Sequence, residues 1–460
     1  MAAVTGSAGD ALTDRPSAVA DPSRVTLTLI LTVTVASFEA TATATLAPAA
    51  LAEIGGRSSY PLVFGLFVLA QLVALAAGGV LCGTTGALRI FVAGAVLHGT
   101  GLLVCATATF FGWLAAGRVI QGIGHGLVWV SVYVLIGRCF PPERRGRVLG
   151  YLAMAWAVPA LLGPLIAGVV TDTVGWRWVL APVPAIEAVA LAIMWPSIVG
   201  LWNDRPGMPA GAASLRARLA PALLLACGVV ALMNLRRVPD GWTWPVLAAA
   251  ACAIVLGGRP LLPRGALRLA RGLPATVLLR GLAGGPWAGL AFVLPLALAE
   301  GRGLSLSSAG SALSSGIIGF AVGGVLHTTG WLTRYGRSRV AIAGTALQAA
   351  ALGVTAAGIA GPIALVYAGW ALTGLGANLA MIALNATVID LSPPAEQGTA
   401  SAGMALADAV MTAVATAVAS LVLAGAAGAA VTGAAAALLG GCAVALVAVG
   451  LALPRMNTSR

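Results

Sequence analysis

The chain has 460 residues, of which 59% are hydrophobic and only 9% are charged, and its mean hydropathy is +0.98. About a quarter of the residues of a soluble protein are charged, so this composition excludes an ordinary soluble protein. Apolar runs of about 20 residues recur along the chain, and a bilayer requires this length of a spanning helix. The sequence therefore predicts an all-α polytopic membrane protein.

The net charge is +12, and all 26 basic residues are arginine. Such a charge is compatible with nucleic-acid binding, but the arginines lie in short loops between apolar runs, where anionic membrane lipid is the natural partner. We therefore expect lipid contacts and no nucleic-acid partner. The six cysteines form no CxxC pair, so neither a metal site, a disulfide framework nor a cofactor is predicted.

In chain order, residues 1–24 are polar and lack a basic leader region, which predicts a cytoplasmic tail and not a signal peptide. An N-terminal six-helix bundle is predicted over 25–200, with spans near 25–48, 60–82, 88–109, 112–137, 148–170 and 178–200. A central linker over 201–272 contains two less distinct apolar runs, 219–235 and 242–258. A C-terminal six-helix bundle is predicted over 273–453, with spans near 274–299, 307–328, 340–359, 363–390, 399–424 and 430–453. Residues 454–460 form a second cytoplasmic tail.

The distribution of arginine over alternate loops predicts the orientation. Most arginines fall on one side, and only five lie in loops on the other: Arg57, Arg177, Arg236, Arg237 and Arg302. Positive loops stay inside, so both termini are predicted in the cytoplasm. A single central span would place Arg334, Arg337 and Arg339 outside, so either zero or two central spans are compatible with the count. We expect two, giving 14 spans with 12 as the alternative, in the plasma membrane of a bacterium.

An internal repeat relates the two halves. Six residues of the first half recur 252 positions later: Gly117, Gly122, Gly124, Pro141, Pro142 and Gly146 correspond to Gly369, Gly374, Gly376, Pro393, Pro394 and Gly398. Pro48 and Glu53 likewise recur 247 positions later as Pro295 and Glu300. Two six-helix repeats in the same orientation predict a transporter whose halves rock about a site near the membrane midplane.

Three motifs carry a family resemblance. They are Glu39-x-Thr41 followed by Pro48, the run Gly117-Arg118-x-x-Gln121-Gly122-x-Gly124, and the loop from Pro141 to Gly146. On these residues the chain resembles the major facilitator superfamily, in particular its fourteen-helix drug:proton antiporter branch. The resemblance implies alternating access, proton-coupled efflux of hydrophobic or amphiphilic small molecules, and function as a monomer.

Two glycine-rich segments resemble gating motifs of that family. Gly150, Gly163, Pro164 and Gly168 have the spacing of its fifth-helix antiporter motif, and because proline kinks a helix and glycine permits close approach, we assign them to gating. Gly79, Gly83, Gly86 and Arg89 occupy the loop between the second and third spans. Gly83 stands where the family usually has an acid. The lock of the cytoplasmic gate is therefore expected to be built differently here.

Glu39 is the main candidate for proton coupling. An ionisable residue inside a span is costly and points to function, and Glu39 lies at about the depth expected for Arg118, some 20 Å into the first span. We expect Glu39 to alternate between protonated and ionised forms beside Arg118, so that proton uptake competes with substrate release. The alternative is a permanent ion pair that only fixes helix packing.

Other polar residues are secondary candidates for lining the cavity: Thr43, Gln121, His125, Asn378, Asn385 and Asp408. Arg118, Gln121 and His125 share one helix face by their spacing. Asp408 fits a capping role as well as a cavity role, and the two asparagines fit helix packing somewhat better. His98 is expected to make a helix contact. Glu187 and Arg280 are weaker candidates, because both can reach an interface by snorkelling.

In the repeat alignment Arg118 corresponds to Trp370 and Glu39 to Pro286, so the second half has lost these charges. We therefore expect proton handling in the first half and an apolar substrate surface in the second. The residues proposed for that surface are Trp287, Phe292, Trp370 and Met381.

Other functions stay open at this stage. Export of one endogenous metabolite or lipid fits the same features, and the altered loop motif leaves uncoupled transport or uptake possible. No nucleophile and base pair, metal set or phosphate-binding loop indicates an enzyme.

Overall fold

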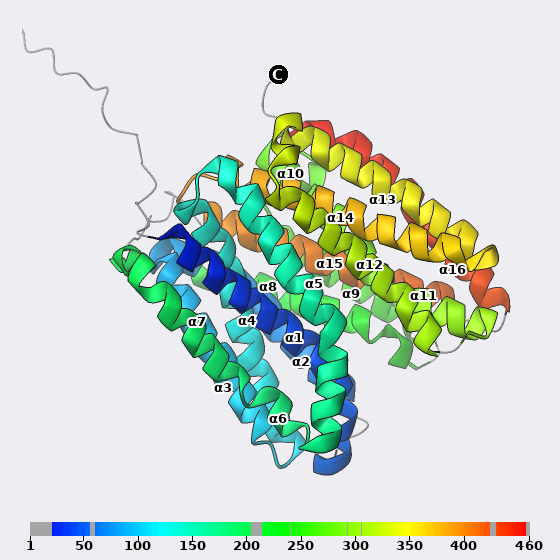
Figure 1. Cartoon of the computed structure of the whole chain (residues 1–460), viewed down its shortest axis with the longest axis horizontal. Coiled ribbons are helices and arrows are strands. Elements are labelled where there is room, and N and C mark those ends of the chain that lie inside the picture. The colour runs from blue at the N-terminus through cyan, green and yellow to red at the C-terminus, as the bar shows by residue number, and fades with distance from the viewer. Residues whose placement is uncertain are drawn as a thin grey trace, which may run out of the picture.

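The computed structural model describes residues 21–55, 60–203, 214–239, 241–291, 293–304, 306–423 and 429–456. Most of the predicted tails, together with Phe292, lie outside these ranges. The described ranges contain helices and connecting turns and no strand, and the helices form two groups that meet near the centre of the molecule (Figure 1). The prediction of an all-α protein is confirmed.

The first group contains seven helices: α1 (Pro22–Ile54), α2 (Tyr60–Thr84), α3 (Ala87–Ala106), α4 (Phe111–Cys139), α5 (Pro142–Thr173), α6 (Arg177–Leu180) and α7 (Val183–Ile198). Local sequence sets several boundaries. The Asp21 carboxylate accepts a hydrogen bond from the Ser23 amide at 2.9 Å, and Pro22 occupies the first turn of α1. Gly86 separates α2 from α3 at φ 102°, a conformation that glycine adopts without strain.

The predicted central linker contains α8 (Leu215–Met233) and α9 (Thr243–Gly258), which pack as a pair. Gly228 lies against Ala250 and Gly257 against Pro221 and Leu225, so two glycines allow the backbones to approach closely. α8 also packs on α2 and α15 (Gln397–Leu423). The pair therefore lies beside both groups.

The second group contains α10 (Leu273–Leu290), α11 (Val293–Leu296), a π-helical turn at Ala297–Gly301, α12 (Leu306–Thr328), α13 (Arg337–Ala360), α14 (Ile363–Leu391), α15 and α16 (Ala429–Ala452). The span predicted over 274–299 is thus divided between α10, α11 and the π-helical turn. α10 packs mainly on α15, and α13 packs on α14 and α16.

In the described ranges, 12 helices are long and apolar enough to cross a membrane. The predicted count of 14 is therefore not confirmed, whereas the alternative of 12 agrees with this number. The set includes α8 but neither α9 nor α10. α9 has only 16 residues, about 24 Å at 1.5 Å per residue, which is shorter than a typical hydrocarbon core.

The two groups touch along α2 with α15 and α5 with α12. These contacts are closest near the arginine-rich loops: Gly79 lies against Gly398 and Ala402, and Gly150 lies against Gly324. We call this the arginine-rich end. At the opposite end the groups diverge, and α6 and α11 lie far apart in Figure 1.

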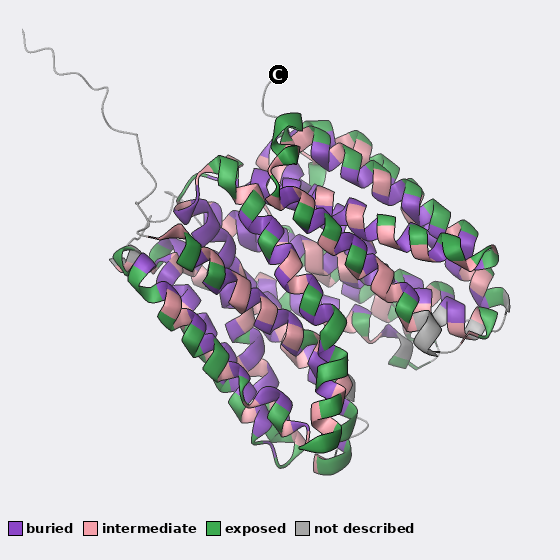
Figure 2. Ribbon diagram, in the orientation of Figure 1, coloured by how far each residue is buried: buried purple, intermediate pink, exposed green. Residues whose placement is uncertain are grey.

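Many large apolar residues are exposed, and Figure 2 shows exposed positions in green along the outer faces of the helices. On α16, for example, Val444 is 72% and Leu451 79% exposed. A surface of this kind is costly in water and favourable in lipid. The exposed apolar faces of the bundle agree with a multi-pass membrane protein.

Candidate functional site

A buried ion pair lies inside the first helix group. Glu39 of α1 accepts a hydrogen bond from the Arg118 guanidinium of α4 at 2.7 Å, and these residues are only 1% and 5% exposed. Two helices that are distant in sequence thus place opposite charges together in an apolar interior. The shared depth expected from the sequence agrees with this contact.

Neighbouring side chains hold both partners. The Thr43 hydroxyl donates to Glu39 Oε1 at 2.7 Å, and Arg118 donates to Gln121 Oε1 at 2.5 Å and to the Val63 carbonyl at 3.0 Å. The guanidinium also lies 4.4 Å from the centre of the Phe67 ring, a cation–π geometry. Glu39 Oε2 is buried without a hydrogen-bond partner among the described residues. The site therefore has one free carboxylate oxygen where a proton can bind.

Histidines extend this region toward the centre of the molecule. His98 Nδ1 of α3 lies 2.6 Å from Glu187 Oε1 of α7, and both side chains are buried. Glu187 therefore does not snorkel to an interface. The His125 ring lies 5.8 Å from the His98 ring and stacks on Trp129 at 5.8 Å. The spacing argument placed His125 on the face of Arg118 but gave no sign that Glu187 is part of the same region.

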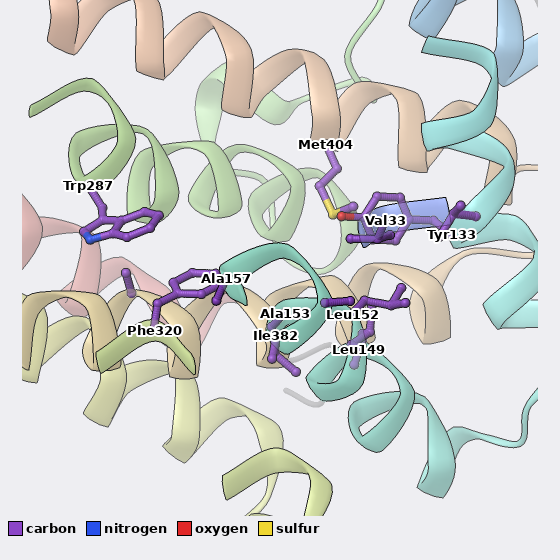
Figure 3. Close-up of a cluster of buried hydrophobic side chains, with 14 of the residues drawn as sticks. Val33, Tyr133, Leu149, Leu152, Ala153, Ala157, Trp287, Phe320, Ile382 and Met404 are labelled. Atoms are coloured by element: carbon purple, nitrogen blue, oxygen red, sulfur yellow. The ribbon is translucent and has the colours of Figure 1, made fainter. Parts of the chain in front are cut away.

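A cavity of about 210 Å³ lies between the two helix groups. Its wall combines large aromatic and apolar side chains with three polar ones, and its lining includes Trp129, Tyr133, Trp156, Trp287, Phe320, Met381, Arg280, Asn385 and Asp408. Trp287 and Phe320 stack with their ring centres 4.8 Å apart, and Figure 3 shows them facing each other. Trp156 of α5 contacts both rings. Both halves thus build the cavity wall.

A second ion pair, between a buried arginine and a half-buried aspartate, forms the polar part of this wall. Arg280 of α10 donates to Asp408 Oδ1 of α15 and to Asn385 Oδ1 of α14, each at 2.7 Å. Arg280 is 4% exposed, so it does not snorkel, and Asp408 lies in the cavity wall. The charges equivalent to Glu39 and Arg118 are absent from the second half, but a different arginine and acid pair there. The repeat alignment missed the pair because it compared only the positions equivalent to Glu39 and Arg118.

The residues suggested for a substrate surface separate into three groups. Trp287 and Met381 line the cavity. Trp370 is 1% exposed and packs against Gly316, and it is not part of the cavity wall. Asn378, a candidate for lining the cavity for which helix packing was favoured, is buried against Gly323 and is not part of the cavity wall. Phe292 lies outside the described residues.

Charged contacts join the two halves at the arginine-rich end. Asp390 at the end of α14 pairs with Arg145 of α5 and with Arg337 of α13. Arg337 also donates to the Pro142 carbonyl at 2.7 Å, and Arg145 to the Gly137 carbonyl at 2.7 Å. The acid in these contacts is therefore Asp390 of the second half. Arg89, in contrast, lies 5.3 Å over the Trp202 ring.

The gating glycines lie in two different settings. Gly150 meets α12, and Gly163 lies directly against Thr41 of α1. Gly168 has only one distant neighbour, a Thr45 methyl 4.0 Å from the place of a side-chain carbon. Pro164 lies inside α5 between these glycines. Only Gly150 and Gly163 are therefore held by close approach to a neighbouring helix.

Nothing in this arrangement indicates a bound metal. Within the described ranges, no group of three or more histidine, cysteine, aspartate or glutamate side chains is placed to hold a metal ion. The site offers a buried ion pair in the first helix group and a half-buried ion pair at a cavity between the two helix groups.

Comparison with known proteins identifies this class. The model of the Major Facilitator Superfamily matches residues 29–278 and 276–460, and the chain belongs to that family. This confirms the family resemblance seen in the motifs and places the chain among transporters, not enzymes. Transporters of this family bind small-molecule substrates.

Curated relatives match in part. The chain is 29% identical over 167 residues to "Multidrug resistance protein 3" of Bacillus subtilis, a match covering 36% of this chain and 33% of that protein. It is 28% identical over 216 residues to a "Probable multidrug-efflux transporter" of Mycobacterium tuberculosis, covering 46% of each. The chain spans about half or less of the length of these relatives.

Solved structures support the fold over nearly the whole chain. The human organic anion transporter MFSD10 superposes with a TM-score of 0.70 at 16% identity, covering 94% of this chain and 100% of that one. A bacterial homologue of the iron transporter ferroportin in an outward-facing state gives a TM-score of 0.67 at 13% identity, covering 95% and 100%. At these identities the likeness concerns the fold alone.

Proposed function

We propose that this protein exports hydrophobic or amphiphilic small molecules from the cytoplasm, driven by inward flow of protons. The observation that carries the proposal is a sealed Glu39–Arg118 pair in one half, separate from an aromatic cavity shared by both halves. The named multidrug transporters among its relatives support the substrate class. The proposal places the protein in a bacterial plasma membrane as a monomer, with both termini in the cytoplasm.

The cycle follows from the charge on Glu39. When Glu39 is ionised, it neutralises Arg118; when a proton binds at Oε2, the guanidinium loses its counter-ion in an apolar interior. An uncompensated buried charge is costly, so the helices that hold Arg118 favour a different arrangement after protonation. Proton uptake in this scheme shifts α1 and α4 relative to each other and thereby changes access to the cavity.

The position of the closed end assigns a state in this cycle. The halves touch through Asp390, Arg145 and Arg337 at the arginine-rich end and diverge at the other. With the arginine-rich end taken as cytoplasmic, we assign this arrangement to a state in which the two halves are in contact on the cytoplasmic side. The alternating-access scheme then requires these contacts to break when the cavity opens to the cytoplasm.

The test uses purified protein in inside-out-oriented proteoliposomes with ethidium as the probe and an imposed pH gradient, acidic inside. We expect the dye to accumulate inside and to leak back when an uncoupler collapses the gradient. Empty liposomes are the control. Accumulation that persists with the uncoupler would exclude proton drive.

A narrower substrate range has one specific observation in its favour. The cavity is about 210 Å³, below the roughly 300–1,000 Å³ of most ligand pockets, and it contains a fixed ion pair. Both features suit export of one small endogenous metabolite. Uptake of a broad panel of dyes by the same proteoliposomes would exclude this second candidate.

A further inference from the structure

The His98–Glu187 contact is a buried charged group that the proposed cycle does not use. It joins α3 to α7 at 2.6 Å, and its side chains are 3% and 9% exposed. Neither residue lines the cavity between the halves. The contact lies near Glu39 and Arg118, so the charges of these groups act on it.

Few charged groups surround the His98–Glu187 contact. The titratable and charged groups that face His98 and Glu187 are Glu39 from α1 and Arg118 and His125 from α4. Arg118 carries one positive charge, and Glu39 already engages it. A second carboxylate in this interior is costly without its own compensating charge. One proton beyond the one that a neutral imidazole carries must therefore reside on His98 or Glu187, so that the pair is neutral overall.

Several buried polar atoms near this contact are able to bind a proton or a water molecule. Glu187 Oε2, His98 Nε2 and Glu39 Oε2 are all buried without a hydrogen-bond partner among the described residues. Buried polar atoms of this kind are rare and are usually met by ordered water or serve in proton chemistry. Three of them in one region favour exchange of protons with water over a closed, static contact.

His125 and Trp129 lie between this region and the cavity. The His125 ring lies 5.8 Å from the His98 ring and stacks on Trp129, and Trp129 lines the cavity. An imidazole and an indole thus occupy the space between the His98–Glu187 contact and the substrate cavity. The His125 imidazole is therefore the titratable group between the His98–Glu187 contact and the cavity wall.

We propose that His98 and Glu187 form a second proton-binding site of the first half, in addition to Glu39. The site takes one proton from water, shares it between His98 Nδ1 and Glu187 Oε1, and returns it to water, with no bond to carbon and no electron transfer. The role of this proton in transport rests on the proposed proton-driven function, whereas its binding does not.

The competing explanation is that the contact only packs α3 on α7. The chain itself supplies a comparison, because Gln348 occupies the position of His98 in the second half: Gly124 lies against His98, and the equivalent Gly376 lies against Gln348. There its amide donates to the Ala283 carbonyl at 3.2 Å. An amide is thus sufficient to join helices at this position, and His98→Gln is a matched variant that keeps a hydrogen-bonding group but cannot take up a proton.

The binding test needs no substrate. Infrared difference spectra of the full chain in nanodiscs, between about pH 5 and about pH 9, report protonated carboxyl groups. We expect a carboxyl band that Glu187→Gln removes, His98→Gln shifts, and Glu53→Gln, an exposed acid of α1, leaves unchanged. Spectra of Glu187→Gln and His98→Gln that match the original protein would overturn the second site.

The transport test is kept separate. In the proteoliposomes described above, the pH gradient that just balances a given dye gradient reports the number of protons per dye. We expect Glu187→Gln to lower this number by one. If the original chain transports no dye under a pH gradient, the proposed function fails while the spectra still decide the proton site. An unchanged number in Glu187→Gln would exclude the second proton from the cycle.

A folding control guards both tests. The double variant His98→Gln with Glu187→Gln replaces both side chains of the hydrogen-bonded pair with amides. Neither partner is then left as an unpaired buried charge. We expect it to fold and to lose the same carboxyl band as the single variant. A double variant that folds but keeps the band would assign the band to another residue and contradict the proposal.

Discussion

Each half of the transporter buries one arginine with one acid, but the two pairs differ in access. In the first half the Glu39 side chain is 1% exposed, whereas in the second half the Asp408 side chain is 35% exposed at the cavity wall. The chemistry is the same, and the surroundings differ. In the proposed cycle, the sealed acid therefore serves proton coupling and the acid at the cavity serves substrate recognition.

The surroundings of the two arginines support this division. Arg118 is fixed by three helices, through Glu39 on α1, the Val63 carbonyl on α2 and Gln121 on its own α4. Arg280 is fixed by Asn385 and Asp408, both of which line the cavity. A substitution of Glu39 is therefore expected to alter helix packing, and a substitution of Asp408 is expected to alter binding of a solute in the cavity.

The largest effect is expected from Glu39→Gln. The variant leaves Arg118 without its counter-ion, and breaking a buried ion pair costs about 3–5 kcal/mol. We expect dye accumulation driven by a pH gradient to fall by about 100-fold, the upper range of coupling energies between sites. Dye binding, measured by fluorescence quenching of the cavity tryptophans, should change little.

Two controls belong to this prediction. Glu53→Gln removes an exposed acid from the same helix and should transport normally. Glu39→Gln combined with Arg118→Met removes both charges, and replacing a buried pair by apolar groups is often neutral for stability. Recovery of proton-driven accumulation in this double variant would show that the pair serves only helix packing.

The next largest effect is expected at Gly163 of α5, which we assigned to gating. Gly163→Leu would force α5 away from Thr41, because no space exists for a side chain there. We expect the transport rate to fall by about tenfold with little change in dye affinity, since each factor of ten corresponds to about 1.4 kcal/mol. Gly168→Ala, five residues along α5, meets only a methyl at 4.0 Å and should behave normally. A loss of affinity in Gly163→Leu would argue against gating.

A smaller and more selective effect is expected at the cavity. Asp408→Asn keeps a hydrogen-bond acceptor for Arg280 but removes the negative charge from the wall. We expect affinity for cationic dyes to fall about threefold to tenfold and affinity for uncharged ones to stay the same, because a partly solvated charge contributes about 1 kcal/mol. Equal losses for both kinds of dye would indicate a structural role for Asp408.

How far the sequence predicts these features depends on whether they are local. Glu39 and Arg118 lie in short motifs with a recognisable spacing, so their pairing was open to prediction. Arg280 and Asp408 lie 128 positions apart on two helices, and no local pattern links them. The predicted span near 242–258 was placed well, but its helix of 16 residues is too short to decide a membrane crossing from hydropathy.

The closed end shows the same limit. The absence of an acid at Gly83 was visible in the sequence, and it predicted a different lock. The replacement could not be found, because Asp390 lies at the end of a long apolar run and meets Arg145 only when the two halves pack together. Acidic residues at span ends that face arginine-rich loops of the other repeat are the signal to look for.

The smallest expected effect is at this lock. Asp390→Asn weakens the contacts to Arg145 and Arg337, and because these groups are partly exposed to solvent, the loss is about 0–1 kcal/mol. We expect the population opened at the arginine-rich end to rise about twofold to fivefold, as less than about 1 kcal/mol allows. Spin labels at Glu143 and Trp331, both exposed and on opposite halves, would measure the separation once the exposed Cys227 and Cys252 are removed. Asp172→Asn, an exposed acid at the other end of α5, is the matched control. A distance distribution that Asp390→Asn leaves unchanged would assign closure to the other contacts at this end, such as Gly79 with Gly398 and Gly150 with Gly324.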